Sequence, residues 1–240
     1  MSKSKRREQE RKPTRSEKAY RDFTPAKPLQ PLNQAQAEYI HSVESHPYIM
    51  ATGYAGTSKT YVPTRIAAKW LKQEAIEKIV IVRPATSMSQ SLGFFKGDHI
   101  DKMKMWIAPV LDTLREEFKP GYLDYLLSEE IAAIDCVPLE TAKGRSFKNA
   151  FIIIDEAEDL TLEEVKTLLT RLGTNSTMVF AGDIKQVDIA KSGLGEFPEL
   201  RKRSERLQRV VDHIDFDGYD DIVRSDAVRE VIIGLDEVEA

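Results

Sequence analysis

The stretch MATGYAGTSKTYV, residues 50–62, constrains the fold more than any other part of the chain. Gly53, Lys59 and Thr60 have the spacing of a phosphate-binding loop, G-x-x-x-x-G-K-[ST]. One position departs from the pattern, because Ser58 stands where the second glycine belongs. An apolar strand precedes the loop and a helix is expected after it, which is the order that such a loop requires.

The chemistry of such a loop assigns a task to its residues. Backbone N–H groups at the start of the following helix would surround phosphate oxygens. Lys59 would reach the β- and γ-phosphates, and the Thr60 hydroxyl would bind Mg²⁺. Ser58 keeps its N–H, so its cost is at most a few kcal/mol of strain if its φ angle is positive. The alternative is a chance glycine turn before a helix. The predicted nucleotide-binding residues of the loop are Gly53, Tyr54, Ala55, Gly56, Thr57, Ser58, Lys59, Thr60 and Tyr61.

Apolar strands alternate with helices along the rest of the chain. Strands are expected at 47–53, 78–84, 136–140, 150–155, 176–183 and 206–214. Helices are expected at 34–45, 59–75, much of 100–131, 161–173 and 220–235. This alternation predicts an α/β fold, with one parallel sheet covered by helices on both faces and no break into two domains.

Two of these strands end in polar residues that suit a nucleotide site. The strand AFIIIDE would lie beside the phosphate-loop strand and deliver Asp155 to Mg²⁺, with Glu156 orienting or deprotonating the attacking water. The strand MVFAGD is followed by Gln186, whose amide would contact the γ-phosphate or the water. The alternatives are a helix N-cap for the acidic pair and an ordinary polar turn for Gln186.

Composition and charge narrow the class of protein. The net charge of −4 gives no overall attraction to nucleic acid, but residues 1–22 carry nine Lys/Arg against four acids. This segment is either a solvated tail or an arm that contacts nucleic-acid phosphates. With a single cysteine, Cys136, no secretory signal and no membrane-length apolar run, we expect a cytoplasmic protein that binds no membrane. The expected organisation is a basic flexible tail over 1–27, a domain over 28–233 and an acidic tail over 234–240.

Taken together, several motifs resemble those of the PhoH-like proteins. They are GYAGTSKT, VRPA, GRSFKNAFIIIDEAEDLT, LLTRLG, GDIKQVD and DIVRSDAVREVI, which occur in the family's order over residues 28–233. The resemblance implies a single-domain P-loop ATPase with a RecA-like sheet, related to the N-terminal motor domain of superfamily 1 helicases, with ATP and Mg²⁺ as ligands. Ser58 and Glu158 depart from the family, which usually has Gly and Gln there. An ionised Glu158 cannot donate a hydrogen bond.

The resemblance also implies roles for residues outside the loop. Gln36, or alternatively Gln34, would read the adenine edge, and Gln186 would sense the γ-phosphate. Arginines that match family motifs are candidates for an arginine finger to a neighbouring subunit, or else ordinary surface ion-pair partners. They are Arg83, Arg145 and Arg171, with Arg224 as a further candidate for the finger.

A single motor domain can complete such a site only with residues of a neighbour. The resemblance therefore implies a homo-oligomer, with a hexameric ring expected. One function class is an ATPase acting on RNA or single-stranded DNA in a bacterium or a bacteriophage-infected cell. The other is a nucleotide-binding regulatory or assembly protein with weak turnover. Scattered histidines and the absence of paired Cys/His spacing argue against a nuclease or zinc site.

Overall fold

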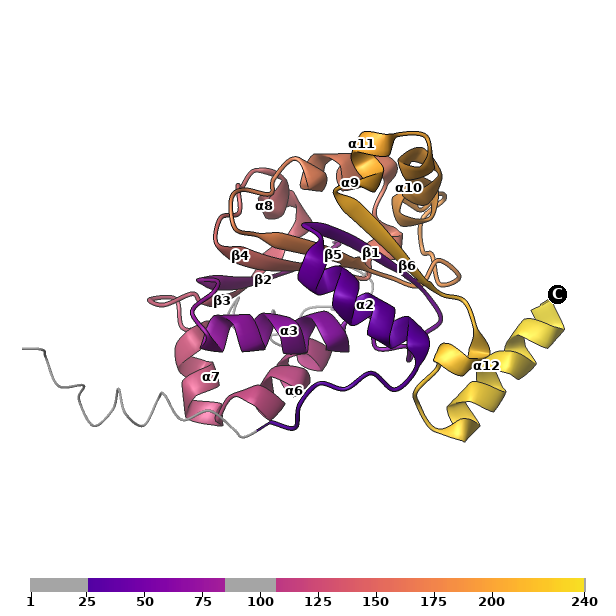
Figure 1. Ribbon diagram of the computed structural model, residues 1–240, viewed down its shortest axis with the longest axis horizontal. Coiled ribbons are helices and arrows are strands. Elements are labelled where there is room, and N and C mark those ends of the chain that lie inside the picture. The colour runs from indigo at the N-terminus through magenta and orange to yellow at the C-terminus, as the bar shows by residue number, and fades with distance from the viewer. Residues whose placement is uncertain (1–25, 85–106, 240) are drawn as a thin grey trace, which may run out of the picture.

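In the computed structural model, which describes residues 26–84 and 107–239, six strands form one sheet (Figure 1). The order is β3–β2–β4–β5–β1–β6, and every neighbouring pair is parallel. The strands are β1 (Tyr48–Gly53), β2 (Lys78–Arg83), β3 (Ile134–Pro138), β4 (Ala150–Asp155), β5 (Thr177–Ala181) and β6 (Val211–Phe216). The predicted α/β fold with a parallel sheet is confirmed.

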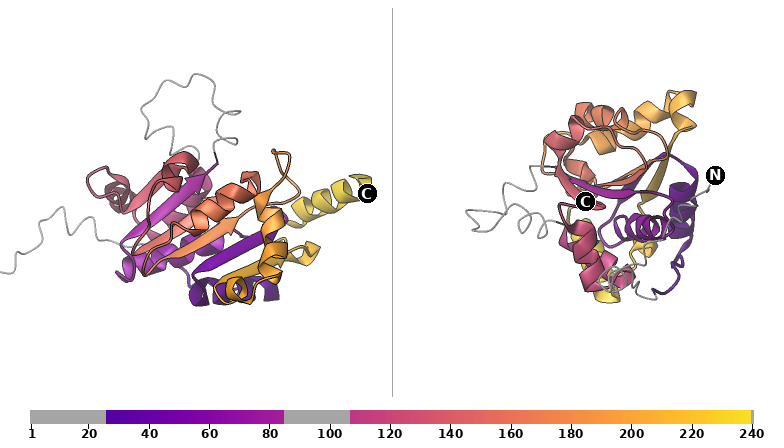
Figure 2. Two further views of the ribbon diagram at one scale, coloured as in Figure 1. Left: turned by 90° about the horizontal axis from the view of Figure 1, so that it is seen from above. Right: turned by 90° about the vertical axis from the view of Figure 1, so that its left-hand side faces the viewer.

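Helices cover both faces of this sheet (Figure 1). One face carries α2 (Gln34–Ser45), α3 (Tyr61–Lys72), α6 (Ala108–Glu117) and α7 (Pro120–Leu127). The other carries α8 (Leu139–Lys143), α9 (Leu162–Leu169), α10 (Gly193–Lys202) and α11 (Glu205–Gln208). Two short 3₁₀ turns, η1 (Ala157–Asp159) and η2 (Tyr219–Asp221), follow β4 and β6. The last helix, α12 (Asp226–Glu239), extends away from the sheet beyond β6 (Figure 2). In the described part of the chain, no helix has the length and apolarity needed to cross a bilayer.

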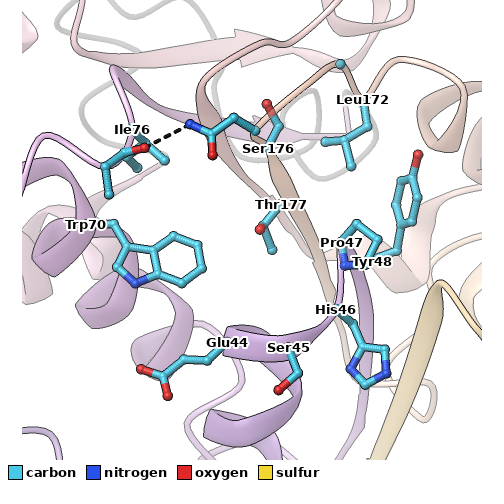
Figure 3. A pocket seen from close by; sticks show the side chains of 13 residues that line it. Glu44, Ser45, His46, Pro47, Tyr48, Trp70, Ile76, Leu172, Ser176 and Thr177 are labelled. Carbon is cyan, nitrogen blue, oxygen red and sulfur yellow. Dashed lines mark hydrogen bonds between the residues drawn. The ribbon is translucent and has the colours of Figure 1, made fainter.

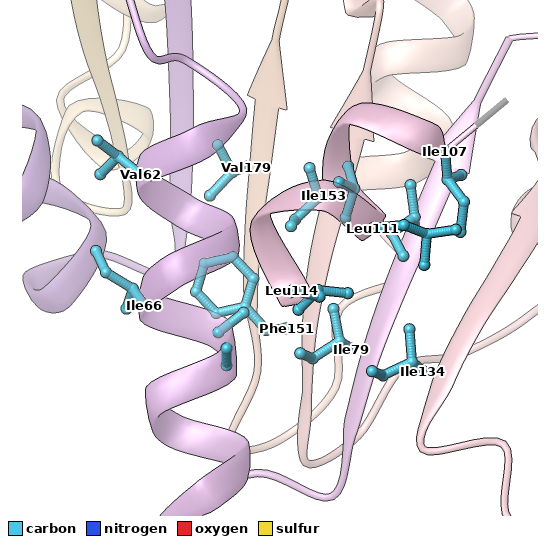
Figure 4. Close-up of a cluster of buried hydrophobic side chains, with 14 of the residues drawn as sticks. Val62, Ile66, Ile79, Ile107, Leu111, Leu114, Ile134, Phe151, Ile153 and Val179 are labelled. Carbon is cyan, nitrogen blue, oxygen red and sulfur yellow. The ribbon is translucent and has the colours of Figure 1, made fainter. Parts of the chain in front are cut away.

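The two helical layers explain why the central strands are apolar at every position. On β4, Phe151 and Ile153 pack toward α3 and α6, whereas Ile152 and Ile154 pack toward α9 and α10. All four side chains are fully buried. Figure 4 shows the first of these two clusters, which includes Phe151 and Ile153 of β4 and Ile66 of α3. Because helices cover both faces of this parallel sheet, its central strands are apolar at every position and do not alternate between apolar and polar residues.

Several expected elements differ from the structure. The segment 206–214 begins within α11, and its strand starts only at Val211. The closing helix starts at Asp226 instead of 220, and it continues through residues 234–239, which were expected to belong to an acidic tail. Helix α9 stops at Leu169, four residues before Gly173, because Thr170 caps it. Helix α8 takes Leu139 from the expected strand 136–140, since Pro138 lies at its N-cap.

One expectation about the sheet was wrong in a way that matters for the site. We expected the strand ending in Asp155 to lie beside the phosphate-loop strand, but β5 lies between them. In the register of the sheet, Asp155 is level with Ala181 of β5, which is level with Ala51 of β1. The three strands still end at one edge, because parallel strands point the same way. Residues 85–106, which include the start of the helical region expected over 100–131, and residues 1–25 of the basic tail lie outside the described residues.

Candidate active site

The phosphate-binding loop, residues 54–60, joins β1 to α3 at the carboxyl edge of the sheet. In it and just before it, Gly53, Gly56 and Ser58 have positive φ angles of 122°, 81° and 72°. Ser58 therefore adopts the left-handed conformation that glycine usually provides, at a cost of ~1–2 kcal/mol. The loop keeps the backbone shape of the pattern despite the substitution.

The two glycines of this loop permit close contacts with the C-terminal segment. A Cβ at Gly53 would lie 2.2 Å from the carbonyl oxygen of Phe216 on β6. A Cβ at Gly56 would lie 2.9 Å from Cγ and Cδ of Arg224. Gly53 is thus needed for strand packing, and Gly56 lets the Arg224 side chain lie against the loop.

Lys59 is folded back onto the loop that precedes it. Its Nζ donates hydrogen bonds to the carbonyl oxygens of Gly53 (2.7 Å) and Tyr54 (2.6 Å). Burial lowers the pKa of Lys59, and the charge of nearby acidic side chains, Asp183 first, opposes that shift. The Lys59 ammonium group therefore lies among several acidic side chains.

Thr60 and Asp155 form the pair expected for a metal site. Thr60 is the N-cap of α3, but its hydroxyl donates to Asp155 Oδ1 (2.8 Å) instead of capping the helix. Burial raises the pKa of Asp155, and the charge of Arg83 opposes the shift. Within the described residues, no group of three or more His, Cys, Asp or Glu side chains is arranged to hold a metal ion. A cation here would take its remaining ligands from phosphate or water oxygens.

Glu156 stands at the end of β4 in a strained conformation. Its φ angle is 54°, which is left-handed, and this turns the chain into η1. The carboxylate accepts a hydrogen bond from Arg83 Nη2 at 2.5 Å, and Arg83 Nε lies 3.8 Å from Asp155 Oδ2. Arg83, at the end of β2, therefore bridges both acids of the motif.

Glu158 is buried beneath the neighbouring strand β5. Only 3% of the residue is exposed, and a Cβ at Gly182 would lie 2.3 Å from Glu158 Oε2. Burial, together with a hydrogen bond shared with Glu156, raises the pKa of Glu158 to about 9. This environment favours the protonated form of Glu158, which could donate a hydrogen bond to Glu156. The expectation that it cannot donate applies only to the ionised form, which this environment disfavours.

The turn after β5 adds the third polar group. Gln186 Nε2 donates to Asp183 Oδ2 (2.8 Å), and Asp183 Oδ1 accepts from the backbone N–H of Lys185 (3.0 Å). These contacts fix the Gln186 amide at the same edge as the phosphate loop. The predicted sensor residue is thus held by an acid of its own turn.

A cavity of about 470 Å³ joins these groups. The loop contributes Ala55, Gly56, Ser58, Lys59, Thr60 and Tyr61 to its wall. The strand ends contribute Asp155, Glu156, Glu158, Asp183 and Gln186, and Arg224 closes one side. The sequence analysis did not anticipate Pro109 and Thr113 of α6 in this wall. They carry no motif, and only the packing of α6 against α3 brings them there.

Two of the candidate arginines lie away from this cavity. Arg145 pairs with Asp135 (2.8 Å), and Arg171 follows α9, where its carbonyl accepts from the N–H of Phe147 (2.9 Å). Neither residue contributes to the wall of the cavity. Arg83 and Arg224 are the candidates that the fold brings to the site of the same chain.

The two candidate adenine-reading glutamines differ in their surroundings. Gln34 is exposed and donates to Glu38 (2.9 Å). Gln36 is buried, its Oε1 accepts from the N–H of Leu32 (2.9 Å), and its Nε2 has no hydrogen-bond partner among the described residues. Of the two, Gln36 has the spare donor, although it does not line the cavity.

A polar cluster that sequence reasoning missed joins the loop to α12. Asp236 accepts hydrogen bonds from Tyr54 Oη, from Tyr219 Oη (3.0 Å) and from Lys185 Nζ (2.8 Å). The Lys185 ammonium also lies 4.3 Å from the centroid of the Tyr54 ring. No local pattern signals this cluster, because its members are far apart in the sequence.

A second cavity, of about 600 Å³, lies at the opposite edge of the sheet (Figure 3). Trp70, Ile76 and Leu172 face it together with His46, and Asn175 Nδ2 donates across it to the carbonyl of Ala75 (2.9 Å). None of the predicted site residues lines this larger cavity.

A family model described as "PhoH-like protein" matches residues 28–235. This chain belongs to the PhoH-like family. It is 34% identical to Protein PhoH of Escherichia coli K12 over 205 aligned residues. The aligned segment covers 85% of this chain and 57% of the Escherichia coli protein. A PhoH-like protein of Bacillus subtilis is 32% identical, and the alignment covers 88% of this chain and 65% of that protein. A PhoH-like protein of Synechocystis is 36% identical, and the alignment covers 66% of this chain and 49% of that protein. The chain thus spans less than two thirds of these relatives.

A solved structure supports the fold of this PhoH-like chain. The large terminase from a thermophilic bacteriophage superposes with a TM-score of 0.51. The match covers 85% of this chain and 50% of the terminase at 12% identity, so it bears on the fold alone. Together with the family match and the phosphate loop, it supports a RecA-like P-loop fold.

Proposed function

We propose that this protein binds ATP with Mg²⁺ and hydrolyses it as a homo-oligomer, acting on RNA or single-stranded DNA. The observation that carries the proposal is that Lys59, Thr60, Asp155 and Glu156 line one cavity, although they come from two distant segments. Such a combination of cation, metal-binding oxygens and a further carboxylate is what phosphoryl transfer to water requires.

The residues present fit both implied ligands. The left-handed residues Gly56 and Ser58 shape a loop whose N–H groups meet the N-terminus of α3, which favours phosphate. The oxygens of Thr60 and Asp155, 2.8 Å apart, suit a hard cation such as Mg²⁺. When bound, Mg²⁺ would neutralise charge on the β- and γ-phosphate oxygens. Gln36 Nε2, a buried donor without a partner among the described residues, suits an adenine acceptor.

The roles of the other residues follow from their contacts. Lys59 would exchange its two carbonyl partners for phosphate oxygens, and Glu156 would orient the attacking water. Gln186, held by Asp183, would contact the γ-phosphate. Arg145 and Arg171 lie away from their own chain's cavity, so either would act as a finger only on a neighbouring copy. A hexameric ring is the assembly that we expect to supply it.

The contact between Glu156 and Arg83 favours a second candidate function. The guanidinium of Arg83 lies 2.5 Å from Glu156 Oε1 and occupies an oxygen that would otherwise face the attacking water. If Arg83 stays in place when nucleotide binds, turnover is slow and the protein is a nucleotide-binding regulatory or assembly protein. Under the first proposal, Arg83 releases Glu156 and interacts with phosphate.

Nucleic acid enters the proposal through charge. Residues 1–22 carry nine Lys/Arg against four acids, and such a segment attracts phosphate backbones in a salt-dependent manner. We expect single-stranded RNA to raise the rate of hydrolysis at low salt and to lose this effect as salt is raised.

The test is Mg²⁺-dependent ATP hydrolysis with and without single-stranded RNA, together with binding of a fluorescent ATP analogue. Lys59→Ala should weaken binding and abolish turnover, whereas Glu156→Gln should bind nucleotide normally and lose turnover by ~100-fold or more. Chelation of Mg²⁺ should abolish hydrolysis in the unmodified protein.

The outcomes separate the two functions. Hydrolysis that needs Glu156 and rises with RNA supports the nucleic-acid-linked ATPase. Tight binding with slow turnover that Glu156→Gln leaves unchanged would exclude it and favour the regulatory protein. Binding that survives Lys59→Ala would exclude both.

A further inference from the structure

Helix α12 presents an apolar stripe to solvent. Val231, Leu235 and Val238 are 61%, 57% and 83% exposed, and their i, i+4, i+7 spacing places them on one face. Figures 1 and 2 show that this helix extends away from the sheet instead of packing on it. A contiguous apolar stripe on the surface of a projecting helix indicates a site at which another molecule binds.

An acidic row runs beside the apolar stripe. Glu230 and Glu237 each precede a stripe residue and lie about 100° around the helix from it. Both side chains are exposed, and neither forms an ion pair with any described residue. The whole helix carries five acids and one arginine, so its partner should be basic and partly apolar.

The same chain carries a surface with those properties around α11. Residues 201–209 contain five cations and one acid. Arg203 and Arg206 are exposed and form no ion pair with the described residues, and Val210 beside them is 40% exposed. We define this region, residues 203–210, as the basic surface. It combines unpaired guanidinium groups with an apolar contact point.

One molecule cannot bring these two surfaces together. In Figure 1 α11 lies beside α9 and α10 on one face of the sheet, whereas α12 lies beyond the carboxyl end of β6. The contacts of Asp236 with Tyr54 and Lys185 also hold α12 where it is. A second copy can satisfy both surfaces at once.

We propose that α12 of one copy docks on the basic surface of another copy, with Val231, Leu235 and Val238 packed on Val210 and with Glu230 and Glu237 paired to Arg203 and Arg206. The contact joins two different surfaces, so each copy offers one of each and the contact can be repeated around a closed assembly. The proposal rests on the oligomeric part of the proposed function and names the surfaces that form it.

The attachment of α12 to the phosphate loop gives this contact a further consequence. Asp236 joins the helix to Tyr54 of the loop and to Lys185, which lies next to Gln186. The docked helix is therefore hydrogen-bonded to the same loop that would hold the nucleotide. We expect nucleotide to change the affinity between copies, and association to change nucleotide affinity by the same factor.

The test uses charge reversal and mixing of the full-length chain. Glu230→Lys/Glu237→Lys places two cations at the positions that would face Arg203 and Arg206, and Arg203→Glu/Arg206→Glu makes the basic surface acidic. In analytical ultracentrifugation, each variant alone should have the 27.2 kDa mass of one chain. The substituted positions of one copy would then repel the unchanged surface of the next copy. An equal mixture of the two should associate again, since each surface then meets its opposite in the other variant.

Further variants cover the remaining outcomes. Leu235→Asp, at an exposed position, should also give monomers without changing thermal stability. Association that survives charge reversal, or that the mixture does not restore, overturns the proposal. Loss of association on deletion of residues 1–22 alone would assign α12 to the basic tail instead. Nucleotide binding by the monomeric variants separates this result from the ATP proposal, because none of the substituted residues lines the cavity.

Discussion

The two edges of the sheet each carry a cavity, and the smaller one is the better candidate site. The opposite-edge cavity of about 600 Å³ is lined by apolar and uncharged polar side chains together with His46, and exposed Glu44 lies at its rim. The phosphate-loop cavity of about 470 Å³ contains buried Lys59, Asp155 and Glu158, whose pKa values are all shifted. Buried ionisable side chains with shifted pKa values mark a functional site better than volume does.

Backbone strain alone does not separate the two edges. Ser58 and Glu156 have positive φ angles at the phosphate-loop edge, and Glu74 and Asn175 have them at the other. At the opposite edge these residues only turn the chain between a helix and a strand. At the phosphate loop they direct N–H groups and a carboxylate into a polar cavity. The comparison therefore depends on what the strained residues present.

The largest expected effect comes from Glu158→Gln. Because burial raises the pKa of Glu158 from 4.5 to about 9, the folded protein holds a proton that the unfolded chain releases. Its contribution to stability is present below pH 4.5 and is lost as pH rises toward 9. Glutamine donates the same hydrogen bond without a proton to lose. Between pH 6 and pH 8 we expect the free energy of unfolding of the parent to fall by ~3 kcal/mol more than that of the variant, measured by urea unfolding.

The matched control is Glu163→Gln, an exposed acid on α9 of the same charge. It should give a stability curve parallel to that of the parent protein. If the curve for Glu158→Gln is parallel as well, Glu158 is ionised in the folded state. The shifted pKa of Glu158 could then no longer be used to distinguish the phosphate-loop cavity from the cavity at the opposite edge.

Ser58→Gly should have a smaller, stabilising effect. Glycine adopts a φ angle near 72° without the steric cost that serine bears, although it gains entropy in the unfolded chain. We expect a net gain of ~0.5–1 kcal/mol in the free energy of unfolding. Ser58→Ala keeps the strain and should give no gain. Equal melting temperatures for the two variants would show that the loop is not strained at this position.

The sequence predicted the parts of the molecule whose cause is local. The strands β2 and β4 are continuous apolar runs, and the loop has its glycine, lysine and threonine at fixed spacing. Helix α10 was missed because Gly193, Gly195 and Pro198 lower its intrinsic helical propensity, and only its N-cap Ser192 signals it. The gathering of Lys59 and Asp155 followed from the rule that parallel strands end at one edge.

The remaining features depend on contacts between distant segments. The insertion of β5 between β1 and β4 is a property of strand order, and no strand's own sequence encodes its neighbours. The Glu158 carboxyl is buried where Gly182, the residue after β5, packs closely on it. The Asp236–Tyr54 contact joins residues 182 positions apart. Local patterns identified the residues of the site, whereas packing determined their protonation and partners.

Asn175→Gly at the opposite edge should have the smallest effect and therefore tests the comparison most directly. Asparagine tolerates a φ angle of 52° better than serine does, so glycine relieves little strain there. The change removes hydrogen bonds from Nδ2 to the Ala75 carbonyl (2.9 Å) and to Asn149 Oδ1 (3.3 Å), both exposed. We expect a loss of ~0.5 kcal/mol of stability and an unchanged affinity for ATP analogues. A clear change in nucleotide affinity would show that the larger cavity is coupled to the phosphate loop, and the two edges could no longer be treated as functionally separate.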